Sequence, residues 1–273
     1  MRDLAPMPPR SQSQVRIGVV GAGGRMGSAV IAAVRAHPAA RLAGAVEHAD
    51  HACIGRPLDE GLVIGANPLA LAHAADALID FTTPEALGES LGAAEAAGKA
   101  IVIGTTGLNA THLAAIDRAA HTIPVLWSAN MSLGVALLCA LAATAARRLA
   151  DWDAEILDLH HGGKLDAPSG TALQLAEAVA RGRGGAAPEP RDRFARRAAR
   201  PPGEIGFAAL RGGSVAGEHR LFLLGPGERL ELAHVAEDRS LFARGAVAAA
   251  VWLARQPPGR YALAQMLDLP AAL

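Results

Sequence analysis

The sequence predicts an α/β protein in which a doubly wound parallel sheet is followed by a second α+β domain with a mixed sheet. The chain has 273 residues, which is above the usual size of one domain. In the first half, short apolar runs alternate with helical segments, as in a parallel sheet covered on both faces. After about residue 132, strand-like segments follow one another without helices between them, which favours a mixed or antiparallel sheet.

The first half is expected to hold a repeated strand–helix pattern. Residues 15–20 (VRIGVV) are a β-branched run that ends in glycines, as buried parallel strands often do. The next helix should run from Arg25 to His37 and stop at Pro38. Thr83 is expected to cap a helix that has Pro84 at its first position and ends at Gly98. The remaining elements are strands at 41–46, 77–81, 101–103 and 125–127 and a helix at 109–120.

The second half begins with a long apolar helix from about Ser132. A second helix should open at Pro168 and Ser169, and a third should span 240–255 and return to the first domain. Strands are expected at 155–160, 205–210, 214–224 and 229–235. The predicted domains are therefore 15–131 plus 236–273 and 132–235, after a disordered tail at 1–14.

Composition excludes several classes of protein. The 26 Lys and Arg residues balance 26 Asp and Glu residues, so neither nucleic acid nor a membrane is an expected partner. The longest apolar stretch, 133–146, falls short of the ~20 residues that span a bilayer, and no secretion signal is expected. Cys53 and Cys139 belong to no disulfide or metal pattern, so we expect a reducing cytoplasm and no metal. The Arg-rich segment 181–200 is either a solvated connection or an attractor for an anionic substrate.

A glycine-rich turn follows the first strand. Gly21, Gly23 and Gly27 have the spacing G-x-G-x-x-x-G, one residue longer than the commonest dinucleotide fingerprint. Glycines let the backbone approach a pyrophosphate, and the helix behind them offers unpaired N–H groups. A strand precedes the turn and a helix follows it, so the context favours a Rossmann-like dinucleotide-binding domain over a simple tight connection.

Glu47 lies at the end of the second strand, twenty residues after Gly27. A carboxylate at this point accepts hydrogen bonds from an adenosine ribose and repels a 2′-phosphate, which favours NADH. His48 beside it, when protonated, would tolerate NADPH, and a solvated strand-end carboxylate is the remaining alternative. The loops 104–107 (GTTG) and 128–131 (SANM) end two further strands and are either nicotinamide contacts or helix-capping turns.

The segment 160–173 (HHGGKLDAPSGTAL) concentrates proton donors and positive charge. Its two histidines can share one site because the glycines after them let the chain turn at once. The N–H groups of Gly170 and Thr171 then begin a helix, where a carboxylate binds well. The segment therefore favours a small dianion that is protonated as it reacts.

The segment has four other interpretations. An exposed histidine pair is often inert surface, and Ser-Gly-Thr is a common helix cap. A zinc site lacks a third ligand at suitable spacing. Ser169 as a nucleophile lacks the glycine frame of hydrolases, and neither the zinc site nor the nucleophile accounts for the dinucleotide turn.

These segments resemble the 4-hydroxy-tetrahydrodipicolinate reductase family. The resemblance rests above all on His160–Leu173 and extends over nearly everything after the first fourteen residues, including Gly21–Gly27, Glu47, Gly104–Gly107, Asn130, Ile205–Phe207, Arg211–Gly213 and Gly217–His219. It implies reduction of a cyclic imine dicarboxylate by NADH or NADPH with loss of water, in lysine and diaminopimelate biosynthesis. It also implies a homotetramer assembled by the substrate-binding domain.

The resemblance assigns roles residue by residue. His160 and Lys164 match the proton-donor positions, and the substrate positions are matched by His161, Gly170 and Thr171. The cofactor positions are matched by Gly21, Ala22, Gly23, Gly24, Arg25, Met26, Glu47, Gly104, Thr105, Thr106, Ser128, Ala129, Asn130 and Met131.

Two departures from the family pattern matter. Gly162 and Gly163 stand where larger polar residues are usual, which is expected to loosen the loop, and His48 stands where NADPH-using members often have arginine. Two rival functions remain: another NAD-dependent amino-acid or imine dehydrogenase, such as an aspartate dehydrogenase, and a non-catalytic nucleotide-binding protein. The segment 164–171 speaks against the first, and His160 with Lys164 against the second.

Overall fold

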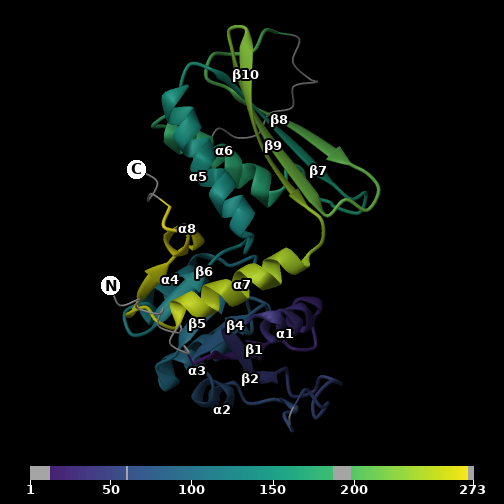
Figure 1. Ribbon diagram of the computed structural model, residues 1–273, viewed down its shortest axis with the longest axis vertical. Helices are drawn as coiled ribbons and strands as arrows, with labels where there is room; N and C mark the ends of the chain where they lie inside the picture. Colours follow the sequence, from purple (N-terminus) through teal and green to yellow (C-terminus); the bar gives the residue numbers. More distant parts are fainter. Residues whose placement is uncertain (1–12, 60, 187–197, 270–273) are drawn as a thin grey trace, which may run out of the picture. The chain divides into compact units, whose positions relative to one another are not determined.

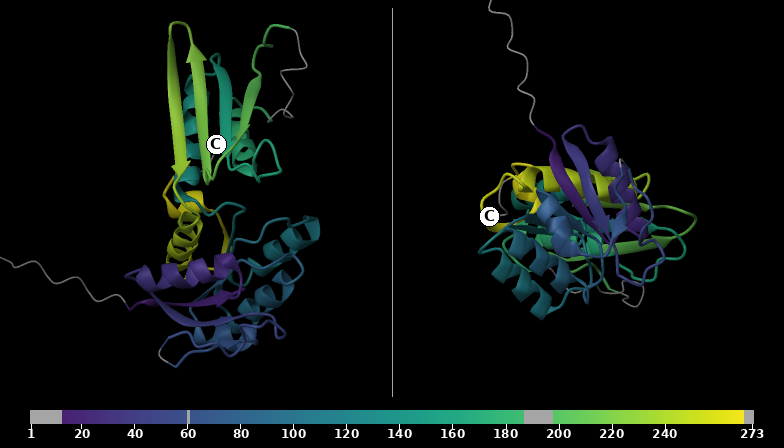
Figure 2. Two further views of the ribbon diagram at one scale, coloured as in Figure 1. Left: turned by 90° about the vertical axis from the view of Figure 1, so that its right-hand side faces the viewer. Right: turned by 90° about the horizontal axis from the view of Figure 1, so that it is seen from below.

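The computed structural model describes residues 13–59, 61–186 and 198–269, so most of the predicted tail and of the Arg-rich segment lies outside the described residues. The chain divides into two compact units. Unit 1 comprises Met1–Trp127 and Ala246–Arg260, and unit 2 comprises Ser128–Gly245 and Tyr261–Leu273 (Figures 1 and 2). The chain therefore returns from unit 2 to unit 1 at Ala246, inside a helix, and passes back to unit 2 at Tyr261.

Unit 1 contains a seven-stranded sheet in the order β11-β6-β5-β4-β1-β2-β3. The pairings from β3 through β6 are all parallel, which confirms the predicted parallel sheet. The strands are β1 (Val15–Val20), β2 (Ala40–Val46), β3 (Ile64–Gly65), β4 (Ala77–Asp80), β5 (Ala100–Ile103), β6 (Pro124–Trp127) and β11 (Gly259–Tyr261). The central strands β4 and β5 are buried along their whole length, because helices cover the sheet.

The helices between these strands are α1 (Arg25–Ala36), α2 (Pro68–Ala74), α3 (Leu87–Ala97) and α4 (Ala110–Ala119). One core cluster joins apolar residues of the sheet to those of α2, α3 and α4. The predicted cap at Thr83 is wrong, since α3 begins at Leu87. The Thr83 carbonyl accepts hydrogen bonds from the N–H groups of Ala86 and Leu87, so a separate turn precedes the helix.

Unit 2 contains a four-stranded sheet in the order β10-β9-β7-β8. β7 pairs parallel with β8 and antiparallel with β9, so the sheet is mixed, as predicted. Its strands are β7 (Asp153–His160), β8 (Ile205–Arg211), β9 (Gly217–Gly225) and β10 (Glu228–Ala236). The helices are α5 (Leu133–Arg148), α6 (Gly170–Gly182) and α8 (Leu263–Met266), while α7 (Ser240–Leu253) spans the boundary between the units.

The helices α5 and α6 pack against each other and against one face of this sheet, as the views of unit 2 show (Figures 1 and 2). Alternate residues of β7 are buried, including Ala154 and Ile156 in the core and Asp158 and His160 at the carboxyl end. Successive side chains of a strand point to opposite faces, so Asp158 and His160 lie on the helix-covered face. This register carries two polar groups to the edge of an apolar core.

No helix among the described residues has the length and apolar character that a membrane crossing requires.

Candidate functional site

The turn after β1 requires glycine at two positions. Gly21 has φ +83°, and its N–H group donates to the Val46 carbonyl at 3.0 Å. A Cβ on Gly27 would lie 2.0 Å from the Gly21 carbonyl oxygen, so only glycine lets α1 pack this closely on the turn. The helix begins at Arg25, and its N-cap residue, Gly24, has no side chain to cover the first N–H groups. The N–H groups of Gly21, Ala22, Gly23 and Gly24 are already bonded within the protein, so the donors left for a pyrophosphate are those of the first turn of α1, from Arg25 on.

A cavity of about 610 Å³ lies beside this turn. Its lining includes Gly21, Gly23, Gly24 and Glu47 from the predicted cofactor set. Glu47 is half-buried, and its carboxylate accepts hydrogen bonds from the N–H groups of Gly23 at 2.8 Å and His48 at 2.9 Å. A carboxylate fixed at the end of β2 and a glycine turn fit the ribose and phosphates of a dinucleotide.

A buried carboxylate organises the other strand ends of unit 1. Asp80 accepts hydrogen bonds from the N–H and hydroxyl groups of Thr82, from the Thr105 hydroxyl at 2.9 Å and from Ser90. The predicted cofactor residue Thr105 is buried and its side chain serves this network, whereas Thr106 is exposed. The Phe81 ring lies where a Cβ on Gly104 would be, at 2.1 Å. Phe81 and Thr82 also line the cavity, although no sequence motif marks them as site residues.

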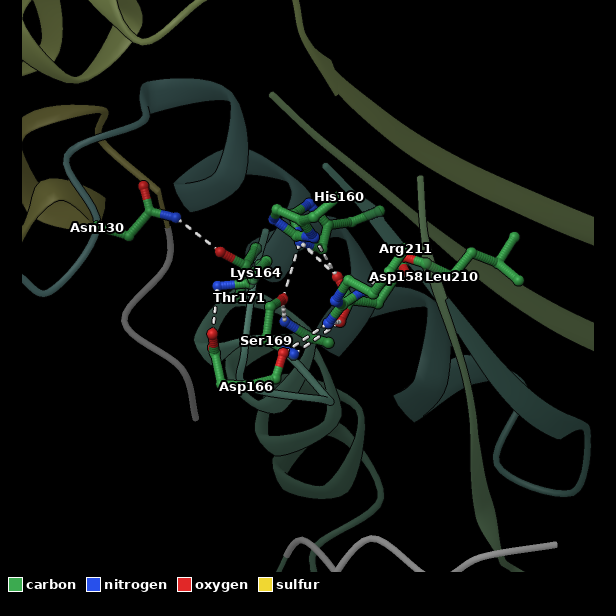
Figure 3. Close-up of polar contacts among 11 residues, drawn as sticks. Asn130, Asp158, His160, Lys164, Asp166, Ser169, Thr171, Leu210 and Arg211 are labelled. Atoms are coloured by element: carbon green, nitrogen blue, oxygen red, sulfur yellow. Dashed lines mark hydrogen bonds and ion pairs between the residues drawn. The ribbon is translucent and has the colours of Figure 1, made fainter. Parts of the chain in front are cut away.

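The remaining predicted cofactor residues, Ser128–Met131, fall in unit 2. The Asn130 side chain donates to the Thr171 hydroxyl at 2.9 Å and accepts from the Ser132 N–H group at 2.9 Å. The Ser128 hydroxyl donates to the Asn130 carbonyl at 2.7 Å. A residue predicted to contact cofactor therefore lies against one predicted to contact substrate (Figure 3).

The His160 imidazole lies in a buried polar cluster at the end of β7 (Figure 3). Its Nδ1 atom lies 2.7 Å from Oδ1 of Asp158. The other carboxylate oxygen of Asp158 accepts hydrogen bonds from the Ser169 N–H group at 2.6 Å and from Arg211 at 3.1 Å. His219 packs edge-on against the His160 ring, with centroids 5.1 Å apart, and its Nε2 atom lies 3.1 Å from the Ser169 hydroxyl.

The cluster sets the protonation of its members. Burial lowers the pKa of His160, and the attraction of Asp158 does not fully offset it. Burial likewise lowers the pKa of His219 to about 4. Burial alone would raise the pKa of Asp158, but the hydrogen bonds from Ser169 and Arg211 hold that pKa below its ordinary value. At neutral pH the cluster thus contains an ionised Asp158 and two neutral imidazoles.

The loop after β7 carries the other predicted site residues of unit 2. The Lys164 ammonium lies 2.8 Å from Oδ1 of Asp166, and this ion pair lowers the pKa of the Asp166 carboxyl. His161 points out of the strand, with its Nε2 atom 3.3 Å from the Arg239 guanidinium. The structure therefore separates the environments of the two histidines: His160 is buried and His161 is half-exposed.

The first turn of α6 provides an anion site. The Ser169 hydroxyl accepts from the Ala172 N–H group at 3.2 Å and so caps the helix. The N–H groups of Gly170 and Thr171 precede that bond and belong to the donors that a helix leaves without an internal partner. A Cβ on Gly170 would meet nothing within 4 Å, so the approach to these groups is open.

Sequence reasoning missed Asp158, Arg211 and His219 as parts of this cluster. The signal for Asp158 was present, because residues two apart on a strand share a face and Asp158 precedes His160 by two. Arg211 and His219 reach the cluster through the pairing of β8 and β9 with β7, opposite His160 and Asp158 respectively. Strand pairing of this kind is a long-range property that local pattern does not reveal.

Comparison with known proteins gives a consistent result. The model of "Dihydrodipicolinate reductase, N-terminus" matches residues 15–131, and that of "Dihydrodipicolinate reductase, C-terminus" matches residues 134–267. The 4-hydroxy-tetrahydrodipicolinate reductase of Methylocella silvestris is 47% identical over 93% of this chain and 97% of its own. 4-Hydroxy-tetrahydrodipicolinate reductase 1 of Mesorhizobium japonicum is 48% identical over 92% of this chain and 96% of its own.

Among solved structures, a dipicolinate-bound dihydrodipicolinate reductase from Paenisporosarcina sp. TG-14 has the same fold. The TM-score is 0.76 at 23% identity, and the match covers 91% of this chain and 97% of the other. The two family models together account for most of the sequence, and the resemblance drawn from residues 160–173 is confirmed. The chain belongs to the dihydrodipicolinate reductase family.

Proposed function

We propose that this chain is a cytoplasmic 4-hydroxy-tetrahydrodipicolinate reductase that uses NADH in preference to NADPH. The observation that carries the proposal is the convergence of Lys164, Thr171 and the first turn of α6 beside His160, in a chain nearly half identical to curated reductases of that name. Both cysteines are free, which supports a reducing compartment.

The first turn of α6 binds one carboxylate of the substrate. The N–H groups of Gly170 and Thr171 donate to it, and the positive end of the 13-residue helix favours the negative charge. The Thr171 hydroxyl accepts its bond from Asn130, so its own proton remains for a substrate oxygen. His161, with Arg239 beside it, adds positive charge at the same loop when protonated. This arrangement suits a ring dicarboxylate.

Lys164 donates the proton that the reduced ring requires. Its amino group offers up to three N–H donors and is only partly exposed, whereas the lowered pKa of His160 makes that imidazole a poor proton donor. Asp166 orients the ammonium through the 2.8 Å contact. His160 then contributes as a neutral, oriented hydrogen-bond partner for the substrate or for Lys164. Of the two proton donors predicted from the sequence, Lys164 is therefore proposed as the acid and His160 as a hydrogen-bonding partner.

The residues of unit 1 fit a nicotinamide dinucleotide. The cofactor, when bound, supplies the hydride. The glycine turn would hold its pyrophosphate, and Glu47 would accept hydrogen bonds from the adenosine ribose. Glu47 also disfavours a 2′-phosphate by charge repulsion, and the adjacent His48 is exposed and lacks the fixed charge of an arginine. These two residues support the preference for NADH.

Unit 2 presents a surface for assembly into a homotetramer. Helices α5 and α6 cover one face of the sheet. On strands β8, β9 and β10, the side chains of Leu210, Leu224 and Val235 are 49%, 37% and 53% exposed. Strand pairing places Leu224 opposite Asp153 and Leu210 opposite Leu159, on the face away from the helices. A second copy of the chain would bury this apolar face. Light scattering coupled to size exclusion tests the proposal, and a monomeric mass would reject it.

Cofactor oxidation tests the activity directly. Purified protein is mixed with NADH and with freshly condensed pyruvate and aspartate semialdehyde, and absorbance of the reduced cofactor is followed. We expect rapid oxidation that needs both condensation partners. A substrate screen that gave turnover only with amino acids or other imines would favour an aspartate dehydrogenase-like enzyme. NADH binding without any turnover would leave a nucleotide-binding protein.

A further inference from the structure

Three metal-ligating groups of different kinds meet in the loop that follows β2. One ligand atom each from Glu47, His51 and Cys53 lies within 4.8 Å of the other two. The His51 Nδ1 atom and the Cys53 sulfur are 2.9 Å apart, and Cys53 is buried while His51 is exposed. Glu47 also has a proposed role towards the cofactor ribose, whereas His51 and Cys53 have none in the proposed reaction.

Backbone hydrogen bonds hold this loop in one conformation. The His51 N–H group donates to the His48 carbonyl at 2.9 Å, and the Ile54 N–H group donates to the His51 carbonyl at 3.0 Å. The Gly55 N–H group donates to the Ile64 carbonyl at 2.8 Å, which ties the loop to β3. Two successive turns therefore place the three ligands on one side of the loop before any ion arrives.

We propose that Glu47, His51 and Cys53 bind a thiophilic divalent cation of the Zn²⁺ class. A thiolate, an imidazole and a carboxylate are all ligands of Zn²⁺, and three protein ligands leave one of four tetrahedral positions open. The thiolate and the carboxylate together balance the charge of the ion. Cys53 belongs to no recognisable metal motif in the sequence, because one of its two partner ligands, Glu47, lies at the end of the preceding strand.

A second group of similar composition is a weaker candidate. Asp158, His160 and His219 also lie within 4.8 Å of one another. The Asp158 carboxylate, however, already pairs with the Arg211 guanidinium at 3.1 Å and accepts the Ser169 N–H group at 2.6 Å. A cation placed there would meet the fixed positive charge of Arg211 in a buried site, which is costly. The loop after β2 has no cation in contact with its three ligands among the described residues.

Occupation of the loop site would compete with the cofactor, an inference that rests on the proposed function. Glu47 and His51 both line the cavity beside the glycine turn. A Cβ on Gly23 would lie 2.4 Å from the His51 ring and 3.0 Å from the Cys53 sulfur, so the turn and the metal ligands touch. An ion bound by Glu47 removes the acceptor that the ribose needs. The site therefore gives the enzyme a metal-dependent inhibition at the adenosine end of the cofactor.

Cobalt(II) is a suitable probe because a thiolate ligand gives it a charge-transfer absorption. The reduced full-length chain is titrated with CoCl₂ without substrate or cofactor. We expect a saturating band in the wild-type protein and the same band in C139S, the matched control. Burial raises the pKa of Cys139 to about 11, which makes its thiolate a poor competitor. We expect no band in C53S, and an affinity lowered about tenfold or more in H51Q. A band that persists in C53S, or no band in the wild type, overturns the site.

Inhibition kinetics test the coupling to the cofactor. Zn²⁺ should raise the KM for NADH without lowering kcat in the wild type and in C139S, and chelation should reverse the effect. C53S should be insensitive to the same Zn²⁺ concentration. Displacement of NADH, followed by its fluorescence, replaces the KM measurement if the substrate is not turned over. A cobalt band together with an unchanged cofactor affinity would overturn the competition, and the cobalt experiment stands whether or not the reductase assignment is correct.

Discussion

Asp158 Oδ1 lies 2.7 Å from Nδ1 of His160, and both side chains are buried at the end of β7. The second carboxylate oxygen is held by the Ser169 N–H group and by Arg211, so the carboxylate has little freedom to turn. Because Nδ1 lies this close to a carboxylate oxygen, we expect the proton of the neutral imidazole on Nδ1, with Nε2 as the acceptor. Nε2 faces Gly217, where a Cβ would approach within 2.9 Å, so a glycine keeps that nitrogen accessible.

Asp158→Asn is expected to lower kcat roughly tenfold or more and to leave KM nearly unchanged. The Ser169 N–H group and Arg211 are both donors, so they will keep the amide oxygen at the position they now contact. The new amide nitrogen then faces Nδ1 of His160 and donates to it, which places the imidazole proton on Nε2. Steady-state kinetics measure the effect, and ¹⁵N chemical shifts of the histidines report the tautomer. D153N, at the other end of the same strand, is the control. Equal effects of the two substitutions would mean that Asp158 acts only on stability.

Lys164→Ala should lower kcat by about 10²–10⁴-fold, the range typical of general acid catalysis. His160→Gln should cost less, because the lowered pKa of His160 makes it a poor acid at neutral pH. Both variants are compared over a full range of substrate concentrations, which gives kcat and kcat/KM, with K164R as the conservative control. If K164A kept kcat/KM within about threefold of wild type, which is under ~1 kcal/mol of barrier, Lys164 would not be the proton donor.

Thr171→Val should raise KM about tenfold with little change in kcat. The substitution keeps the shape of the side chain but removes the hydroxyl that is expected to donate to a substrate carboxylate, a bond worth about 1.5 kcal/mol or more to a charged group. It also leaves the Asn130 amide without its acceptor. T171S should restore the KM. A T171S variant as impaired as T171V would point to packing of the methyl group instead.

Stability should fall as the pH drops from about 6.5 to about 4. Burial lowers the pKa of His219 to about 4, with the charges of His160, His234 and Lys164 acting in the same direction and Asp158 opposing them. In this window the unfolded chain, whose histidines titrate near 6.5, binds more protons than the native chain. The free energy of unfolding attributable to this group therefore falls by up to about 3 kcal/mol.

Urea denaturation across that pH range measures this linkage. H219Q should show a shallower loss of stability towards acid, whereas H121Q, which replaces an exposed histidine, should follow the wild type. An H219Q profile parallel to the wild type would show that other groups carry the acid sensitivity.

His48→Arg should shift the cofactor preference towards NADPH, because the KM for NADPH should fall about tenfold. A guanidinium beside Glu47 can bind a 2′-phosphate through two parallel hydrogen bonds. The exposed His48 imidazole, whose Nδ1 atom lies 3.9 Å from Asp50, cannot offer such a pair. The comparison is of kcat/KM for NADH and NADPH in both proteins. A wild-type enzyme that already strongly prefers NADPH would refute the assignment drawn from Glu47.

Local pattern predicted most of the parallel sheet, because each strand there is a short apolar run bounded by glycine, proline or a charged residue. The short elements β3, α2, β11 and α8 escaped, since two to seven residues carry too little periodicity to stand out. The start of α3 was misplaced because the Thr83 carbonyl closes a turn that precedes the helix. Boundaries of this kind depend on hydrogen bonds that residue types alone do not fix.

The candidate site was only partly predictable. His160, Lys164 and Thr171 stand close together in the sequence and share one strand end, loop and helix start. Asp158, Arg211 and His219 belong to the same cluster through strand pairing over distances of up to about sixty residues, which no local motif encodes. The loop ligands Glu47, His51 and Cys53 were likewise unremarkable until two turns brought them together. The sequence alone therefore does not predict which polar residues of distant strands meet in the buried site.

The proposed reaction transfers hydride from a nicotinamide cofactor to a cyclic imine dicarboxylate that the protein also protonates. Isotope transfer tests it most directly: the enzyme receives cofactor deuterated at both C4 positions and freshly condensed pyruvate and aspartate semialdehyde, and the reduced product is analysed by mass spectrometry. We expect a product with a single deuterium, formed far more slowly by K164A and at the wild-type rate by C139S. A product without deuterium, or equal rates in K164A and wild type, would show that the proposed reaction is wrong.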